Sequence, residues 1–418
     1  MMQFDELVAL RRDFHRYAEP AFLEIRTSSI VASRLRALGL EPLTGQAAMR
    51  ADTVVDYPTA ERRELFAERA VNTGADAASV EHAAEFGTAV IAEIKGNRPG
   101  PVWGLRFDMD ALPLAESESA EHAPAAQGFR CDYGAMHACA HDTHTAIGLG
   151  LASRLAANND FAGTVRFLFQ PAEEGGRGAA SMIAAGAAEG IDRFVAVHLG
   201  LDEPAGKVSG GIQGLLATTK MRARFTGTAA HAAGAPEQGA NALVTAASAL
   251  LNVMALPRYS TADTRINVGT LHGGDNVNIV PSWAEMTLEA RSTDSDVSSD
   301  LTERIKSTLR GSGAMHGVGV DVVETGGSAT MDCDAELVDT IDRIAAELSD
   351  AGTTDGFKQM GGSDDASLFA REVQRAGGIA TYMTVGGGNT APHHNPLFDI
   401  DESAMPVALE VLERLIRR

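Results

Sequence analysis

Four apolar segments of this chain alternate with helical patterns, and each of the four ends in or near charged or metal-ligating side chains. Short apolar runs bounded by turn residues are typical of buried strands, and strands that alternate with helices form an α/β sheet. The pattern therefore predicts an α/β domain whose central sheet is flanked by helices. The four runs are PVWGLRFDMDALPL (101–114), TVRFLFQPAEE (164–174), RFVAVHL (193–199) and GIATYMTVGGG (378–388).

A different texture occupies residues 215–323. Strand patterns with polar alternation, KMRARFTG, RINVGTL and AEMTLEARS, surround one apolar helical stretch, ANALVTAASALLNVMA. Because 418 residues exceed what one ordinary globular core holds, a division into domains is expected. The sequence predicts a large domain formed by residues 1–214 and 324–418, with a small α+β domain, residues 215–323, inserted into it.

The N-terminal part is predicted to be helical. Apolar positions between residues 4 and 40 recur at helical spacing on either side of Pro20, which indicates two helices. Residues 41–86 are polar and alanine-rich and include ERRELFAERA. We expect them to form an inserted helical segment that lies outside the core and shapes a substrate entrance.

Composition limits the partners and the compartment. The formal net charge of −21 opposes binding to nucleic acid, which needs a basic surface. No basic, apolar and small-residue signal marks the N-terminus, and no apolar segment is long enough to span a bilayer. Cys131, Cys139 and Cys333 are an odd number of cysteines in a long chain, which favours a reducing compartment over a disulfide framework. A cytoplasmic protein with a small-molecule substrate, and with no nucleic-acid or membrane partner, is expected.

The segment MHACAHDTH (136–144) carries the densest chemistry, with three histidines, a cysteine and an aspartate just before a helical pattern. Thiolate and imidazole are good ligands for zinc and other first-row divalent metals. Cys139 and His141 are two residues apart, so both can bind one ion from a loop. A closed structural zinc site would need four such ligands close together, and no second pair of this kind follows, so the segment favours an open, catalytic metal site. The alternative is that Cys139 is a small buried hydrophobe beside satisfied histidines.

Other strand ends carry residues of the same kind. Glu173 and Glu174 follow an apolar run and precede a glycine-rich turn, which is where open α/β sheets bind ligands. Adjacent carboxylates can divide the work, one coordinating metal and the other accepting a proton from water. His198 ends the run RFVAVHL, and His393 and His394 follow the last run. Each signal is weak alone, since a solvated acidic turn or a core histidine is common, but one shared metal site explains all of them.

Taken in order, RFDMDALPL, MHACAHDTH, FQPAEEG, VHLG, GTAAHAA, NVNIVP, GSDD and PHHNPLFDID resemble the M20 metallopeptidase and amidohydrolase family, in the branch with a cysteine metal ligand. The resemblance covers nearly the whole chain. It implies a central mixed β-sheet flanked by helices, an inserted α+β lid that mediates dimerisation, and two divalent metal ions. Mn²⁺ is the expected metal, with Zn²⁺ as the alternative. The implied ligands are Cys139, His141, Glu174, His198 and His394, the last chosen over His393 because it precedes Asn395.

The resemblance also assigns roles to residues that are not ligands. It implies that Glu173 is the general base and that Asp110 orients the site, although Asp110 alone would read as a loop cap. His231 in GTAAHA would reach the partner subunit's active site and stabilise the oxyanion, although alone it would read as a turn histidine. Asn278 and Arg291 match positions that contact the carboxylate side of the substrate; Arg291 alone would be a surface strand arginine.

Two positions depart from the family pattern. Ala140 stands where the family usually has glycine, and SDD at residues 363–365 stands where it usually has SED. A methyl group at position 140 would strain the ligand loop if the backbone there has a positive φ. Neither departure removes a predicted ligand.

The resemblance implies hydrolysis of the amide bond of an N-acyl amino acid. The insertion at residues 41–86 favours the subgroup that acts on p-aminobenzoyl-glutamate. Indole-acetyl or benzoyl conjugates, or a dipeptide, are alternative substrates. A metal-binding subunit without catalysis is a remote alternative whose only support is Ala140. The working unit is expected to be a homodimer or a heterodimer with a homologous B-type subunit.

Overall fold

The computed structural model describes residues 2–348, 352–353 and 357–418. The chain divides into two compact units, and each is described by itself. Unit 1 comprises Met1–Gln213, Met331–Met360 and Asp364–Arg418, and unit 2 comprises Gly214–Thr330 and Gly361–Ser363. Within the described residues, every helix is too short or too polar to cross a membrane.

Unit 1 is built on a mixed sheet with the strand order β1-β2-β4-β3-β5-β14-β6-β12. Strands β4, β3, β5 and β14 are parallel neighbours, whereas β2 and β6 run antiparallel to theirs. The predicted α/β class with a mixed central sheet is confirmed. The strands are β1 (Leu43–Thr44), β2 (Val90–Lys95), β3 (Arg98–Asp108), β4 (Ala162–Gln170), β5 (Arg193–Gly200), β6 (Lys207–Ser209), β12 (Gly352–Thr353) and β14 (Ile379–Gly386).

Both faces of the central strands are buried. On β5, Val195 and Val197 belong to the main hydrophobic core, whereas the ring of Phe194 stacks on Phe369 at 5.7 Å. Consecutive side chains of a strand point to opposite faces, so this strand packs against helices on both sides. Such burial explains why the four runs are almost continuously apolar. It also explains why polar groups inside them must be paired.

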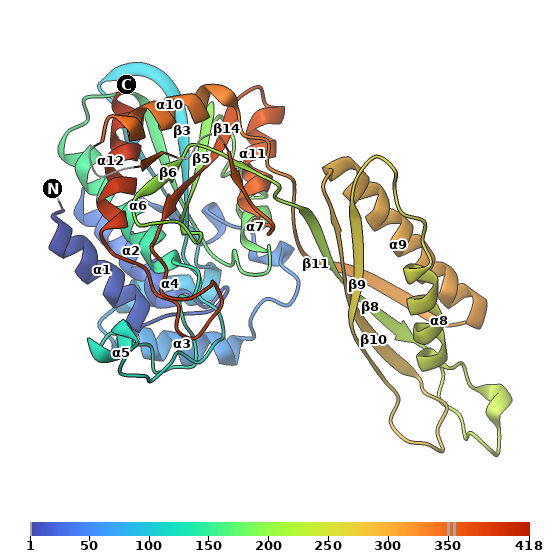
Figure 1. Ribbon diagram of the computed structural model, residues 1–418. Helices are drawn as coiled ribbons and strands as arrows, with labels where there is room; N and C mark the ends of the chain where they lie inside the picture. The colour runs from blue at the N-terminus through green and yellow to red at the C-terminus, as the bar shows by residue number, and fades with distance from the viewer. Residues whose placement is uncertain (1, 349–351, 354–356) are drawn as a thin grey trace. The chain divides into compact units, whose positions relative to one another are not determined.

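Helices cover both faces of this sheet, and in Figure 1 β3, β5 and β14 lie between α6 and α12 on one side and α11 on the other. Contacts of α6 with β3 and of α11 with β5 and β14 support this arrangement. The helices of unit 1 are α1 (Phe4–Arg16), α2 (Ile25–Ala37), α3 (Ala60–Asn72), α4 (Ala77–Phe86), α5 (Ala123–Ala126), α6 (His141–Ala157), α7 (Gly178–Ile183), α10 (Ala335–Ala346), α11 (Ala366–Arg375) and α12 (Ala404–Arg417). A short parallel pair, β7 (Ile212–Gln213) and β13 (Lys358–Gln359), completes the unit.

The inserted segment, residues 41–86, contains α3 and α4, as predicted. Thr59 and Asp76 cap these helices, since their side chains accept hydrogen bonds from Arg62 N and Ser79 N. The segment has a small core of its own that joins it to α2, formed by Ile25, Ala70, Ala75, Val80 and Ala83. It is therefore a packed part of unit 1.

Unit 2 contains an antiparallel sheet with the order β11-β8-β10-β9 and two helices packed on it. Its strands are β8 (Ala217–Thr226), β9 (Thr264–Gly273), β10 (Trp283–Ser292) and β11 (Gly319–Ser328), and its helices are α8 (Ala242–Met254) and α9 (Ser295–His316). The α+β character predicted for this region is confirmed. Residue 323, the predicted end of the inserted domain, lies inside β11, and the unit continues to Thr330.

Candidate metal centre

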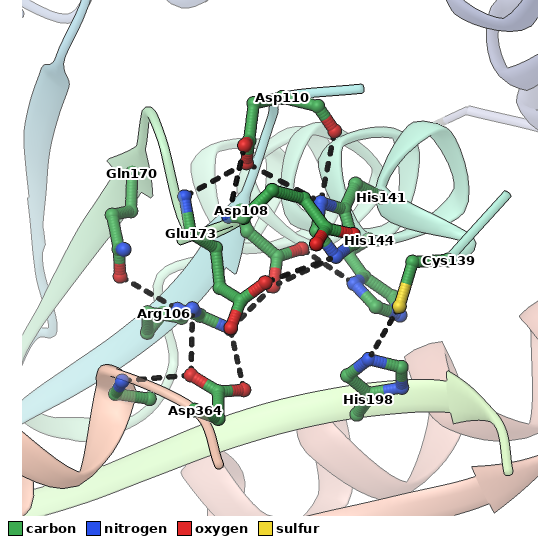
Figure 2. A network of polar contacts seen from close by, with 12 residues as sticks. Arg106, Asp108, Asp110, Cys139, His141, His144, Gln170, Glu173, His198 and Asp364 are labelled. Atoms are coloured by element: carbon green, nitrogen blue, oxygen red, sulfur yellow. Dashed lines mark hydrogen bonds and ion pairs between the residues drawn. The ribbon is translucent and has the colours of Figure 1, made fainter. Parts of the chain in front are cut away.

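The predicted site residues of unit 1 meet at one edge of the sheet. Parallel strands end at the same edge, and the loops that follow β3, β4, β5 and β14 all carry polar residues there. Figure 2 shows the result: Asp110, Cys139, His141, Glu173 and His198 lie around one space, although they are up to 88 residues apart in sequence. This edge is the candidate site.

Asp110 holds three of these residues in place. Its two carboxylate oxygens accept hydrogen bonds from the backbone N–H groups of Glu173 (2.9 Å) and Glu174 (3.0 Å). Its backbone carbonyl accepts a hydrogen bond from Nδ1 of His141 at 2.9 Å. The orienting role predicted for Asp110 has this geometric basis, because one buried residue fixes both glutamates and one imidazole.

His141 and Glu174 present buried polar atoms that lack a hydrogen-bond partner among the described residues. These atoms are Nε2 of His141 and Oε1 of Glu174. One ligand atom each from Cys139, His141 and Glu174 lies within 4.8 Å of the other two. Unpaired buried polar atoms are rare and need an explanation, and a cation among them supplies one. The donor set of sulfur, nitrogen and oxygen fits a first-row divalent metal.

Electrostatics also favour positive charge at this point. Burial opposes a charged His141, but the Asp108 carboxylate outweighs it and raises the pKa of His141 well above its ordinary value. An Asp108 oxygen lies 3.7 Å from His141 Nε2. A proton or a metal ion at Nε2 meets the same attraction.

Cys139 faces two further histidines. Its Sγ lies 3.6 Å from Nε2 of His198 and 3.1 Å from Nδ1 of His393. Nδ1 of His198 donates to the Leu199 carbonyl at 2.7 Å, which leaves Nε2 as the atom with a lone pair toward the thiol. Burial raises the pKa of the Cys139 thiol to about 12. A cation is therefore needed to stabilise the thiolate form here.

The two adjacent histidines of PHHNPLFDID both reach the site. His393 groups with Cys139 and His198, whereas Nε2 of His394 lies 3.3 Å from Oε1 of Glu174. The backbone of His394 has φ of 61°, and its N–H donates to the Ala138 carbonyl at 2.9 Å. This turn ties the segment to the loop that carries Cys139, and it places one histidine on each side of the cluster.

Glu173 lies between the cluster of candidate ligands and an acidic pair. Its Oε2 is 3.8 Å from His141 Nε2, and its carboxylate also groups with Asp364 and Asp365. Burial, followed by repulsion from Asp364 and Glu174, raises the pKa of Glu173 well above its ordinary value. A carboxylate with a raised pKa takes up a proton readily, which suits a general base.

A buried polar network beside Glu173 was not predicted from the sequence. Arg106 on β3 contacts Asp108, Gln170 Oε1 (2.8 Å) and Asp364 Oδ1 (3.0 Å). Asp364 also accepts a hydrogen bond from the Tyr382 hydroxyl at 2.6 Å. The SDD segment thus keeps two carboxylates in this network, and Asp365 accepts from Gln170 Nε2 at 2.7 Å. An arginine inside an otherwise apolar strand was the available signal, because a buried charge must be paired.

His144 has a structural place within the histidine cluster. Its Nε2 accepts the Leu199 N–H at 2.8 Å, so Nδ1 carries the proton that Asp108 accepts at 2.6 Å. Both ring nitrogens are satisfied, and burial lowers the pKa of His144. It therefore fixes Asp108 and the end of β5 and leaves no nitrogen free for a metal.

The N-terminal motif RRDFHRYAE supports the ligand loops from behind. Nε of Arg11 lies 2.8 Å from Oδ2 of Asp142, and its Nη2 lies 2.6 Å from Asp399. His15 Nδ1 lies 2.8 Å from the same Asp142 oxygen. Because Asp142 follows His141 and Asp399 follows the His393–His394 turn, helix α1 joins two ligand segments through buried ion pairs.

Ala140 adopts the left-handed conformation, with φ of 64° and ψ of 16°, and is fully buried at the start of α6. The condition for strain in the ligand loop is therefore met, at a cost of about 1–2 kcal/mol for an L-residue. Ala172 and His394, also at the site, share a positive φ. Strained residues of this kind cluster at functional sites, where the surrounding structure holds them in place.

An Ala140→Val variant is expected to lower the free energy of unfolding by about 2 kcal/mol or more, because a β-branched side chain fits neither the positive φ nor the packed space. Ala140→Gly is the matched control. It is expected to change stability by less than about 1 kcal/mol, since relief of strain offsets the lost methyl group and the gain in unfolded-state entropy. Urea unfolding measures both, and a valine variant as stable as the parent would contradict the strained geometry.

Three predicted site residues lie in unit 2. His231 is exposed, and its Nδ1 accepts hydrogen bonds from Ala233 N and Gly234 N, both at 3.1 Å. The neutral ring therefore carries its proton on Nε2 and can donate from that atom. The Asn278 carbonyl accepts from Ala232 N at 3.0 Å, so His231 and Asn278 belong to adjoining loops.

Arg291 is separated from these two residues. Asn278 lies in the loop that joins β9 to β10, whereas Arg291 lies at the other end of β10, roughly 26 Å along the strand. Its guanidinium pairs with Glu289 through two contacts of 3.0 and 3.1 Å. Asn278 and Arg291 of one chain therefore do not meet at one substrate group.

Comparison with known proteins gives consistent matches. The model of the peptidase family M20/M25/M40 matches residues 104–418. One of the named subunits of the p-aminobenzoyl-glutamate hydrolase of Escherichia coli (strain K12) is 39% identical over 97% of this chain and 93% of its own length. The indole-3-acetyl-aspartic acid hydrolase of Enterobacter agglomerans is also 39% identical, over 97% of this chain and 94% of its own. The crystal structure of an aminobenzoyl-glutamate utilization protein from Klebsiella pneumoniae superposes with a TM-score of 0.84 at 34% identity, covering 99% of this chain and 95% of that one.

Proposed function

The chain belongs to peptidase family M20/M25/M40, a family of hydrolases, and from that premise we propose that it is an amidohydrolase that splits an N-acyl acidic amino acid. The proposed substrate is p-aminobenzoyl-glutamate, which would yield p-aminobenzoate and glutamate. The observation that carries the proposal is the set of buried, unpartnered ligand atoms of His141 and Glu174 directly beside the proton-accepting Glu173.

The residues that would hold two divalent ions are Cys139, His141, Glu174, His198 and His394, with His393 as the alternative for the last. When bound, such ions lower the pKa of water and polarise the amide carbonyl. Mn²⁺ is proposed, and the thiol keeps Zn²⁺ as the alternative.

The chain's own residues supply the proton transfers. Glu173 would accept the proton of the attacking water and then deliver it to the amide nitrogen as the C–N bond breaks. Asp110 keeps Glu173 aimed through the backbone bond at 2.9 Å. In the transition state, negative charge grows on the carbonyl oxygen, and a donor there stabilises it. His231 Nε2–H is the proposed donor, supplied by the lid of a partner subunit.

A dimer follows from that proposal. Asn278 and Arg291 are proposed to contact the carboxylate side of the substrate, and since they lie at opposite ends of β10, the two would come from different subunits. The relative in E. coli is named as one of the subunits of its enzyme, which supports an assembly of more than one chain. The two candidates are a homodimer and a heterodimer with a homologous B-type subunit. A cytoplasmic location is proposed from the odd cysteine count.

Indole-3-acetyl-aspartate is the second candidate substrate, because its hydrolase is as similar as the p-aminobenzoyl-glutamate enzyme, at 39% identity each. Four substrates that combine the two acyl groups with glutamate and aspartate separate the candidates. We expect the highest kcat/KM for p-aminobenzoyl-glutamate with Mn²⁺-loaded protein, measured as release of the free amino acid. Faster cleavage of both indole-acetyl conjugates would keep the reaction and overturn the acyl group.

A further inference from the structure

Arg177 ends the turn that carries Glu173 and Glu174. The N–H groups of Arg177 (3.2 Å) and Gly178 (3.0 Å) both donate to the carbonyl of Ala172, so the turn closes on itself. The guanidinium of Arg177 then lies over the ring of Phe22, 5.2 Å from its centre. A cation is thereby placed one turn away from the candidate base and one candidate ligand.

This guanidinium has no carboxylate partner among the described residues, although its side chain is only partly exposed. The arginines that serve the framework differ in this respect, since Arg106 and Arg11 are each paired with carboxylates. A partly buried cation without an anion is an unfavourable arrangement, and a bound anion removes the penalty. The planar fork of arginine fits both oxygens of a carboxylate.

Tyr57 adds a second polar group next to the same ring. Its ring centre lies 5.4 Å from that of Phe22, and its hydroxyl is buried without a hydrogen-bond partner. Tyr57 belongs to the inserted segment, residues 41–86, which was expected to shape a substrate entrance. A phenol in this state offers a hydrogen bond to an entering ligand.

Glu24 fixes this platform to the catalytic turn. Its Oε1 accepts hydrogen bonds from Phe22 N and Ala172 N, both at 2.9 Å, and its Oε2 accepts from Thr88 Oγ1 at 2.8 Å. Ala172 directly precedes Glu173. The distance between the platform and the candidate base is therefore set by one buried carboxylate, which is what a specificity subsite requires.

We propose that Arg177, assisted by Tyr57, binds the side-chain carboxylate of the acidic amino acid in the substrate. The subsite rests on the proposed function and names its substrate class more closely. Glu24, Glu173 and Glu174 surround the entrance with carboxyl groups, so an acidic side chain needs a cation to be accepted there. Both hydrolases with 39% identity act, by their names, on conjugates of acidic amino acids.

The test compares p-aminobenzoyl-glutamate with p-aminobenzoyl-glutamine, which differ only in the side-chain charge. The ratio of their kcat/KM values, measured with metal-loaded protein, is expected to favour glutamate. In Arg177→Met this ratio is expected to fall roughly 10- to 100-fold, mainly through KM of the glutamyl substrate, as for loss of a charged hydrogen bond. Arg177→Lys is expected to recover part of the ratio, and Tyr57→Phe to lower it by a few fold.

Arg16→Met is the control, because Arg16 also lies over an aromatic ring, that of Tyr17 at 5.6 Å, but on the outer part of α1. It should leave the ratio unchanged. An unchanged ratio in Arg177→Met overturns the subsite, whether activity is kept or lost equally on both substrates. A parent protein that cleaves both substrates equally well also overturns the subsite alone, whereas one that cleaves no N-acyl amino acid overturns the proposed function as well.

Discussion

A Glu173→Gln variant is expected to keep its bound metal and to lose turnover by about 10²- to 10⁴-fold, the usual contribution of a positioned general base. Glutamine preserves the shape of the side chain and the backbone hydrogen bond to Asp110, so the ligand loop should stay in place. What is lost is the acceptor oxygen 3.8 Å from His141 Nε2. Steady-state kinetics and metal analysis of the same sample measure both effects.

Glu174→Gln is the matched control for this variant, since the two residues are adjacent and both are held by Asp110. It should lower metal affinity, and its turnover should recover in part when metal is added in excess. If excess metal restored turnover in Glu173→Gln instead, Glu173 would be a ligand and the two assignments would have to be exchanged.

Cys139→Ala is expected to have the other large effect. Metal affinity should fall by more than about 100-fold, which is beyond the 10- to 100-fold typical of residues behind the ligands. The reason is that Cys139 lies at the centre of the cluster, within reach of His198, His393, His141 and Glu174. In cobalt-substituted protein, the thiolate-to-cobalt charge-transfer band should disappear with the substitution.

Cys131→Ala provides the comparison for a cysteine outside the site. Cys131 is buried in a small cluster with Ala18, Ala111 and Ala135. It should alter stability modestly and leave the cobalt spectrum unchanged. A charge-transfer band that survives in Cys139→Ala and vanishes in Cys131→Ala would refute the proposed ligand set.

The sequence was most informative where one physical requirement governed a whole segment. Fully buried strands must be apolar, so β3, β4, β5 and β14 could be recognised, and parallel strands bring their ends to one edge, so Asp110, Glu173 and His198 could be placed together. The capped helices α3 and α4 were likewise visible as local patterns. The class of fold therefore followed from the pattern of burial.

Pairing between distant segments was not visible in the sequence. Nothing local shows that Arg106 meets Asp364, which is 258 residues away, or that His144 is satisfied by Asp108 and the Leu199 N–H. The choice between His393 and His394 also depends on a turn with positive φ that the sequence does not reveal. In unit 2, α9 and β11 were missed, since β11 alternates weakly and ends in glycines.

The most direct test of the central claim is a metal titration of stripped protein, with release of glutamate from p-aminobenzoyl-glutamate as the readout. We expect no turnover without metal, and full recovery with Mn²⁺ or Zn²⁺ as the bound metal approaches two ions per chain. Glutamate release that persists in the stripped protein, or two bound ions that support no hydrolysis of any N-acyl amino acid, would contradict a metal-dependent amidohydrolase.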